Sequence, residues 1–261
     1  MIRLIAVDMD GTLLDNNHKI NPEFWEIFKK LKAKNIIFTC ASGRQYYSLI
    51  KTFDSIKDDI YFIAENGGFV ASQDKILHIN TLERKRTFEF IDIARKIDSV
   101  NIVLCGKNSA YVESNDPKFL DEVKPYYEKL EIVNSLEEVE DDFLKIALCD
   151  FKNSEKNSYK IFKKFEDEYK ITVSGKLWLD ISNIDTNKGT AMKKLQEILG
   201  ITYDETLVFG DYLNDIELLE SGYHSYAMEN AHPKLKEVAR NIAKSNEENG
   251  VVEKIKELFK F

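Results

Sequence analysis

The stretch Leu4–Asp15, LIAVDMDGTLLD, decides the prediction of the fold. Its apolar residues form a run typical of a buried strand, and the run ends on two carboxylates, Asp8 and Asp10, separated by one residue. Like charges this close repel each other, so a neighbouring group must compensate them. The stretch alone leaves three explanations open: an acidic turn, a metal site or a reacting group.

Four further apolar runs resemble the first and alternate with helical patterns. The runs cover residues 35–42, 61–66, 206–211 and 225–230, and the helical patterns begin near Glu23, Lys188, Asn214 and Pro233. Strands that alternate with helices are typical of an open, doubly wound parallel sheet. The sequence therefore predicts an α/β core, made of residues 1–81 and 184–261.

Residues 82–183 have a different pattern. A helical stretch at 82–97 leads into two expected hairpins, which turn near Asn108–Ser109 and Ser174–Gly175. Hairpins imply an antiparallel sheet, here with helices on one side. We therefore expect a separate α+β domain, inserted into the core as a cap.

Polar residues follow the predicted core strands where each strand ends. They are Asp8 and Asp10, Ser42, Glu65 and Asn66, and Asp211, with Asn214 and Asp215 just beyond. In a doubly wound sheet the carboxyl ends of the strands meet at one edge, and ligands bind there. The sequence thus predicts a functional site at this edge.

Four motifs carry a resemblance to a known family. They are Asp8-Met9-Asp10-Gly11-Thr12, Ser42-Gly43-Arg44, Lys188-Gly189 and Gly210-Asp211-Tyr212-Leu213-Asn214-Asp215. With the four motifs in this order, the chain resembles the haloacid dehalogenase superfamily. The resemblance is to the Cof-type branch of sugar phosphatases, which have a large cap inserted after the third core strand. The resemblance covers the whole chain. One departure is mild, because Ser42 stands where the family often has threonine and the hydroxyl is kept.

The resemblance implies a reaction at the two aspartates. Asp8 attacks phosphorus and forms an aspartyl-phosphate, while Asp10 acts first as general acid and then as general base. At a spacing of two residues, both side chains are expected on the same side of an extended strand. The implied cofactor is Mg²⁺, held by Asp8, Asp211 and the backbone carbonyl of Asp10, with Asp215 orienting a water molecule on the metal.

The resemblance also implies a phosphate site. Lys188 bridges the phosphate and Asp8, and the Ser42 hydroxyl, the Gly43 amide and the Asn214 amide donate hydrogen bonds to phosphate oxygens. Residues expected to face the substrate in the cleft between core and cap are Arg44, Glu65, Asn66, Asp180, Ser182 and Asn183.

Composition limits the partners. The net charge of −8 argues against binding of nucleic acid or of an anionic membrane surface. Three widely spaced cysteines indicate reduced thiols, and the sequence lacks an apolar run of membrane-spanning length. We expect a soluble, monomeric, cytoplasmic enzyme: a Mg²⁺-dependent phosphomonoester hydrolase acting on small phosphorylated metabolites, with sugar phosphates fitting best. The alternatives are a sugar phosphomutase and a non-catalytic regulator that binds a phosphorylated metabolite.

Overall fold

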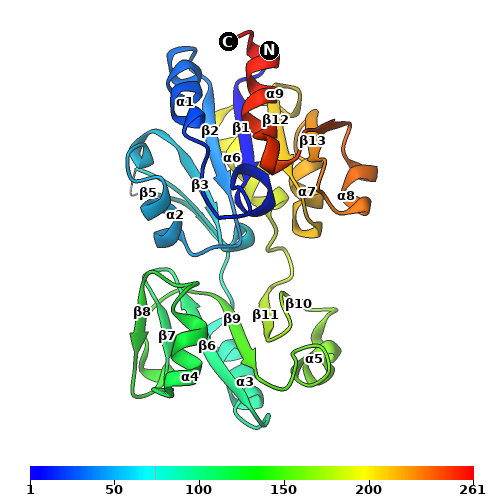
Figure 1. Cartoon of the computed structure of the whole chain (residues 1–261). Coiled ribbons are helices and arrows are strands. Elements are labelled where there is room, and N and C mark those ends of the chain that lie inside the picture. The colour runs from blue at the N-terminus through cyan, green and yellow to red at the C-terminus, as the bar shows by residue number, and fades with distance from the viewer. Residues whose placement is uncertain (74) are drawn as a thin grey trace. The chain divides into compact units, whose positions relative to one another are not determined.

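The part of the chain that carries the predicted site residues of the core is built on a sheet of eight strands (Figure 1). The computed structural model describes residues 1–73 and 75–261. Strand β1 (Leu4–Asp8) lies between β12 (Thr206–Gly210) and β2 (Ile37–Ala41). Outward from β2 follow β3 (Tyr61–Ala64), β4 (Phe69–Ser72) and β5 (Lys75–Ile79), and outward from β12 follow β13 (His224–Met228) and β14 (Asn241–Ala243).

The five predicted strands are present and run parallel to one another, which confirms the α/β fold class. Every residue of β1 and β12 is buried, and this explains their uninterrupted apolar sequences. The prediction missed the outer strands. β4 runs antiparallel to β3, so the sheet is mixed at that edge, and β5 and β14 are too exposed or too short to give an apolar run.

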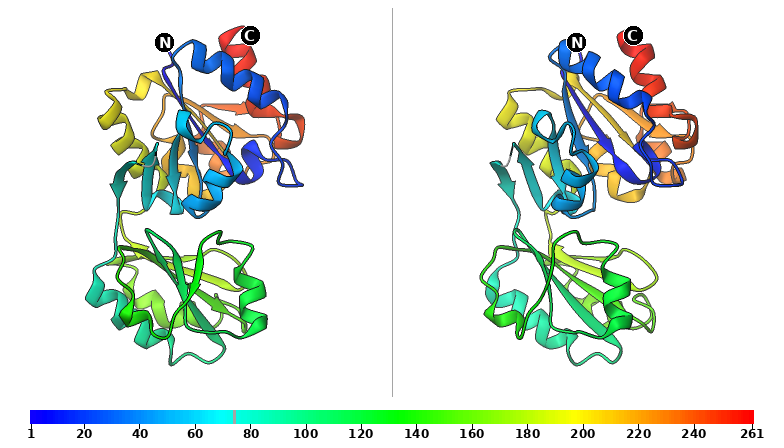
Figure 2. Two further views of the ribbon diagram at one scale, coloured as in Figure 1. Left: turned by 90° about the vertical axis from the view of Figure 1, so that its left-hand side faces the viewer. Right: turned by 60° about the vertical axis from the view of Figure 1, so that its left-hand side comes forward.

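Helices cover both faces of this sheet (Figure 2). One face carries α1 (Glu23–Ala33), α2 (Tyr46–Thr52) and α9 (Gly250–Phe259), and the other carries α6 (Lys188–Leu199) and α7 (Ile216–Leu219); α8 (Pro233–Val238) follows β13. Helix α1 starts where predicted because Oδ1 of Asn21 accepts a hydrogen bond from the backbone N–H of Glu23 at 3.0 Å. Asn187 is the N-cap residue of α6, and its Oδ1 accepts a hydrogen bond from the N–H of Thr190 at 2.7 Å.

The chain divides into two units, of Met1–His78 with Asn187–Phe261, and of Ile79–Thr186. The sequence predicts boundaries after residues 81 and 183. In the structure the units divide after residues 78 and 186, three residues earlier at the first junction and three residues later at the second. The second unit contains a sheet in the order β10-β11-β9-β6-β7-β8. Its strands are β6 (Val100–Gly106), β7 (Ala110–Val112), β8 (Leu130–Ile132), β9 (Phe143–Asp150), β10 (Tyr169–Val173) and β11 (Trp178–Asn183).

Both predicted hairpins of the second unit are present, as β6–β7 and β10–β11. Two expectations were wrong. Helices lie on both faces, since α3 (Arg84–Ala94) and α5 (Ser158–Phe162) pack in one hydrophobic cluster and α4 (Pro117–Val123) packs in the other. Strands β7 and β8 are parallel, because α4 carries the chain back between them as a crossover.

Across residues 1–73 and 75–261, none of the helices combines the length and the apolar composition that a membrane span requires.

Candidate active site

The carboxyl ends of four neighbouring strands deliver the predicted polar residues to one edge of the sheet. Asp8 ends β1 and is paired with Ala41 of β2, so Ser42 follows directly beside it. On the other side Val7 is paired with Phe209, which brings Asp211 to the same level just after β12. Parallel pairing therefore gathers residues that are far apart in the sequence.

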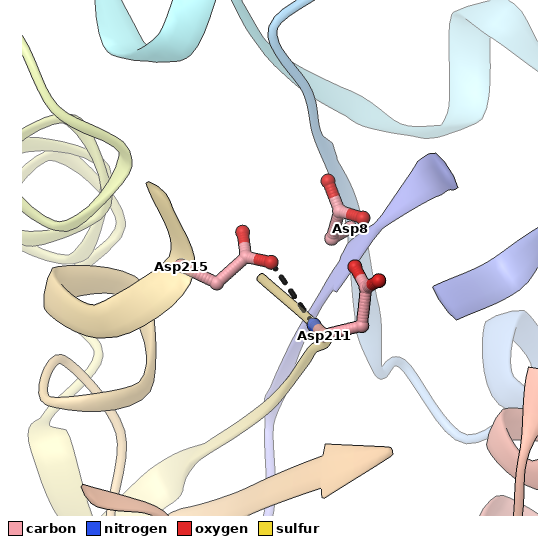
Figure 3. A group of neighbouring side chains, drawn as sticks. All are labelled: Asp8, Asp211 and Asp215. Carbon is pink, nitrogen blue, oxygen red and sulfur yellow. Dashed lines mark hydrogen bonds between the residues drawn. The ribbon is translucent and has the colours of Figure 1, made fainter. Parts of the chain in front are cut away.

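Three carboxylates meet at this edge (Figure 3). One oxygen each of Asp8, Asp211 and Asp215 lies within 4.8 Å of the other two. Asp8 and Asp215 are buried, and Asp211 is partly buried. Carboxylate oxygens this close, out of water, repel one another strongly unless positive charge lies nearby.

Lys188 supplies positive charge to this cluster. Its Nζ lies 2.5 Å from Oδ1 of Asp8 and 2.6 Å from Oδ1 of Asp215, and the side chain is fully buried. Burial by itself would lower the pKa of Lys188, but Asp215 and Asp8 raise it above its ordinary value. The lysine is therefore a fixed ammonium group between two carboxylates.

One lysine does not balance three carboxylates. Burial, followed by repulsion from Asp215, raises the pKa of Asp8 well above its ordinary value, and Lys188 opposes this only in part. Burial and Asp215 likewise raise the pKa of Asp211 to about 6. Asp8 and Asp211 are therefore harder to ionise than ordinary carboxyl groups. A divalent cation beside them would offset the repulsion and the burial that disfavour their ionised forms.

Asp211 and Asp215 are held by different donors. Oδ2 of Asp215 accepts a hydrogen bond from the backbone N–H of Asp211 at 3.0 Å (Figure 3) and another from that of Tyr212 at 3.2 Å. Because Lys188 donates to Oδ1, both oxygens of Asp215 are engaged. Oδ1 of Asp211 accepts from the Thr12 hydroxyl at 3.2 Å. Gly11 has φ +76°, and a Cβ there would lie 2.2 Å from Oδ2 of Asp211, so glycine is required for this close approach.

Asp10 lies two residues beyond Asp8, the last residue of β1, and its own backbone is extended (φ −77°, ψ 120°), so the expectation that both carboxylates lie on one side stays a prediction. Strand β1 ends at Asp8, and residues Met9–Leu13 form a turn in which Asp10 and Gly11 have non-helical dihedral angles. The turn sends the Asp10 carboxylate to Arg44, whose Nε and Nη2 donate to its two oxygens at 2.9 and 2.5 Å. His18 also faces Asp10, with Nδ1 3.4 Å from Oδ1.

The segments after β2 and β3 are joined to each other and to the loop after β12. The N–H of Asn66 donates to the carbonyl of Ser42 at 3.0 Å, and Oδ1 of Asn66 accepts from Nδ2 of Asn214 at 3.0 Å. A Cβ on Gly43 would lie 2.9 Å from Nδ2 of Asn66. Glu65 is buried, and its N–H donates to the carbonyl of Arg44 at 3.1 Å. The structure thus brings together all the predicted site residues of the core.

The three candidates in the second unit lie on β11. Asp180 and Ser182 alternate with the buried Leu179 and Ile181, so they occupy the sheet face on which α4 packs. Oδ2 of Asp180 lies 3.7 Å from Nζ of Lys145. Asn183 instead joins the two ends of the unit, because its Nδ2 donates to Oδ1 of Asn80 at 3.0 Å.

Sequence reasoning missed three residues that shape the core site. Thr12 holds Asp211, Asn187 caps the helix that begins with Lys188, and Nδ2 of Asn230 donates to the carbonyl of Gly11 at 2.8 Å. Signals existed for all three. Thr12 is part of the first motif, Asn187 precedes a helical pattern, and Asn230 is a polar residue at the end of a predicted strand.

The raised pKa of Asp211 predicts a pH-dependent effect of Asp211→Asn. The pKa of Asp211 in the folded state, about 6, is above its ordinary value of 3.8. The protonated carboxyl therefore stabilises the folded state at low pH, and this stabilisation is lost as the pH rises through 6. Asparagine is uncharged throughout. In chelator, thermal unfolding should therefore show the variant gaining several degrees relative to the unsubstituted chain between about pH 5 and about pH 8.

The comparison of both proteins at each pH cancels the titration of groups that do not interact with Asp211. A stability difference that stays constant between the two pH values would contradict the burial argument for Asp211.

Comparisons with known proteins agree with this geometry. A family model described as haloacid dehalogenase-like hydrolase matches residues 5–255. The 5-amino-6-(5-phospho-D-ribitylamino)uracil phosphatase YbjI of Escherichia coli (strain K12) is 35% identical over 262 residues, covering 99% of this chain and 97% of the relative. YwtE of Bacillus subtilis (strain 168), which bears the same enzyme name, is 30% identical over 281 residues, covering 96% of each.

A solved structure shares the whole fold. SMU.1108c from Streptococcus mutans UA159 is 30% identical, has a TM-score of 0.87 and is covered completely, as is this chain. One assignment follows from three findings: the four strand ends that meet around the aspartate cluster, the matching family model, and the relatives named as phosphatases. The chain belongs to the haloacid dehalogenase superfamily, as a phosphatase of the Cof type.

Proposed function

We propose that the chain is a Mg²⁺-dependent phosphomonoester hydrolase that works through an aspartyl-phosphate on Asp8. The observation that carries this proposal is the buried ammonium of Lys188, 2.5 Å from Asp8 and 2.6 Å from Asp215. A carboxylate and a phosphate ester repel each other, and a fixed cation beside the carboxylate lowers that repulsion during attack.

The reaction has two displacements. An oxygen of Asp8 forms a bond to phosphorus while the bond from phosphorus to the ester oxygen breaks, and Asp10 gives its proton to the departing alkoxide. A water molecule then attacks the phosphorus and gives a proton to Asp10, and the bond between phosphorus and Asp8 breaks. The products are the alcohol and inorganic phosphate, and Asp8 and Asp10 return to their starting states.

The residues present fit a magnesium ion. Asp8 and Asp211 offer carboxylate oxygens at the centre of the excess negative charge, and the backbone carbonyl of Asp10 is the third proposed ligand. Asp215 would orient the ligand set without binding the ion, because Lys188 and two backbone N–H groups already engage both its oxygens. When bound, Mg²⁺ supplies positive charge that holds Asp8 ionised and draws in a phosphate oxygen.

Hydrogen-bond donors next to Asp8 would hold the other phosphate oxygens. We assign this task to the Ser42 hydroxyl, the Gly43 amide and the side-chain amide of Asn214. Asn66 would fix the orientation of the Asn214 amide, since it accepts one of the amide protons at 3.0 Å. Glu65 anchors the loop by its backbone bond to Arg44, which keeps these donors in register with Asp8.

We propose a phosphorylated polyol or sugar as the substrate. Two relatives at least 30% identical are named for a phosphate ester of a ribityl chain, in which the phosphate is carried by a primary alcohol. We assign substrate selectivity to the inserted domain, residues 82–183. Asp180 and Ser182 are its candidate contacts to hydroxyl groups, whereas the bond of Asn183 to Asn80 favours a structural role for that side chain. We further propose a cytoplasmic monomer.

Metal exchange tests this function. Hydrolysis of 4-nitrophenyl phosphate and of ribitol 5-phosphate should require Mg²⁺ and should be supported poorly by Ca²⁺. Calcium prefers more oxygen ligands at longer distances, which would misplace the phosphate relative to Asp8. The measurement is release of inorganic phosphate after removal of metal with chelator and addition of each ion. Equal rates with both ions, or full activity in excess chelator, would be incompatible with the proposed metal site.

A further inference from the structure

Asp10 and Arg44 form a bidentate ion pair beside the carboxylate cluster. The guanidinium offers its Nε edge, so that Nε donates to Oδ2 at 2.9 Å and Nη2 donates to Oδ1 at 2.5 Å. Two parallel hydrogen bonds of this kind fix the plane and direction of a carboxylate as well as its position. The Asp10 side chain is about half exposed, and the exposed His18 lies 3.4 Å from its Oδ1, so Arg44 makes the two shorter contacts.

The backbone of Arg44 is fixed from two sides. Its N–H donates to the Ser42 hydroxyl at 3.2 Å, and its carbonyl accepts from the N–H of Glu65 at 3.1 Å. Because β1 and β2 are neighbours in register, this loop lies next to the turn that carries Asp10. The guanidinium therefore reaches Asp10 from a loop that is anchored to the next strand end.

We propose that Arg44 is a positioning residue, which acts through Asp10 by aiming its carboxyl group at the leaving oxygen of the substrate. This inference rests on the proposed function, in which Asp10 is the general acid. It differs from the expectation that Arg44 contacts the substrate, because the Nε edge of the guanidinium is already taken up by both oxygens of Asp10.

The two roles differ in their dependence on the leaving group. If Arg44 acts through Asp10, its loss impairs proton transfer and slows the release of an alkoxide, which needs a proton as the bond breaks. A nitrophenolate leaves with little help, so its release should hardly change. If Arg44 instead binds the phosphoryl group, both esters carry the same group and should suffer alike.

The test is single-turnover release of the leaving group by Arg44→Lys and Arg44→Met, with saturating Mg²⁺. Lysine keeps the charge but loses the fork of two parallel donors, and methionine loses both. For ribitol 5-phosphate we expect a loss of about 10- to 100-fold, a part of the usual general-acid contribution, and for 4-nitrophenyl phosphate a loss below about 3-fold. The concentration giving half-maximal rate should stay unchanged for both esters.

Arg3→Lys is the matched control. Arg3 forms an ion pair with Glu205 at 3.1 Å, so this substitution also weakens an arginine–carboxylate pair of the same domain, away from the site. It should leave both rates unchanged, and thermal unfolding should show all three variants folded. Equal losses for the two esters, or no loss for either, would overturn the inference. Absence of leaving-group release by the unsubstituted chain would overturn the proposed function with it.

Discussion

Replacement of Asp8 by asparagine is expected to reduce phosphomonoester hydrolysis on the order of 10⁴-fold or more. The amide keeps the shape of the side chain and its contact with Lys188 but cannot attack phosphorus as an anion. The fold should persist. Burial and Asp215 raise the pKa of Asp8, so the substitution removes a carboxylate that is costly to bury, and Lys188 keeps its second partner, Asp215.

Steady-state release of phosphate measures this loss, and thermal unfolding checks the fold. Asp204→Asn serves as the control, because it makes the same chemical change at an exposed carboxylate in the turn before β12. The control should keep the full rate. Hydrolysis by Asp8→Asn at a rate close to that of the unsubstituted chain would remove Asp8 from the role of nucleophile.

Asp10→Asn is expected to have the next largest effect, and the effect depends on the ester. Asparagine cannot donate a carboxyl proton to the departing oxygen. Phosphorylation of the enzyme by ribitol 5-phosphate should therefore slow by about 10²- to 10⁴-fold, while phosphorylation by 4-nitrophenyl phosphate should slow much less. Rapid-quench measurement of leaving-group release separates this step from the later hydrolysis.

The same ester preference, but a smaller loss, is expected for Arg44→Lys, since that variant keeps the acid and loses only its orientation. Equal losses for both esters in Asp10→Asn would assign Asp10 to the metal site or to the turn, and not to proton transfer.

Much of the core and its site could be predicted from local sequence. Strands such as β1 and β12 are buried on both faces, so they appear as unbroken apolar runs, and the polar residue that ends each run marks the functional edge. The rule that parallel strands share one carboxyl edge then brings Asp8 and Asp211 together without any knowledge of the side chains.

Direct side-chain pairing was harder to predict, because it depends on backbone turns that have no periodic signal. Strand β1 ends at Asp8, and in the turn that follows Gly11 adopts φ +76° beside Asp211 while the Asp10 carboxylate pairs with Arg44. Glu65 and Asn66 also adopt left-handed backbone, with φ 50° and 53°, which glutamate rarely does. These conformations are imposed by contacts between distant loops.

The inserted unit was predicted less completely for a similar reason. Alternation of residues shows that β11 has two faces, but it does not show which helix covers each of them. The placement of α4 on the face opposite α3 and α5 depends on the parallel crossover between β7 and β8, and hairpin signals do not encode that connection.

The central claim is that phosphate is transferred to Asp8, and the most direct measurement is the mass of the chain caught between the two steps. Asp10→Asn should still be phosphorylated by 4-nitrophenyl phosphate but should lack the base that activates water. Acid quenching followed by peptide mass mapping should then find one phosphoryl group per chain, on the peptide that contains Asp8. Release of nitrophenol without a phosphorylated peptide, or with the phosphoryl group on another residue, would contradict the account.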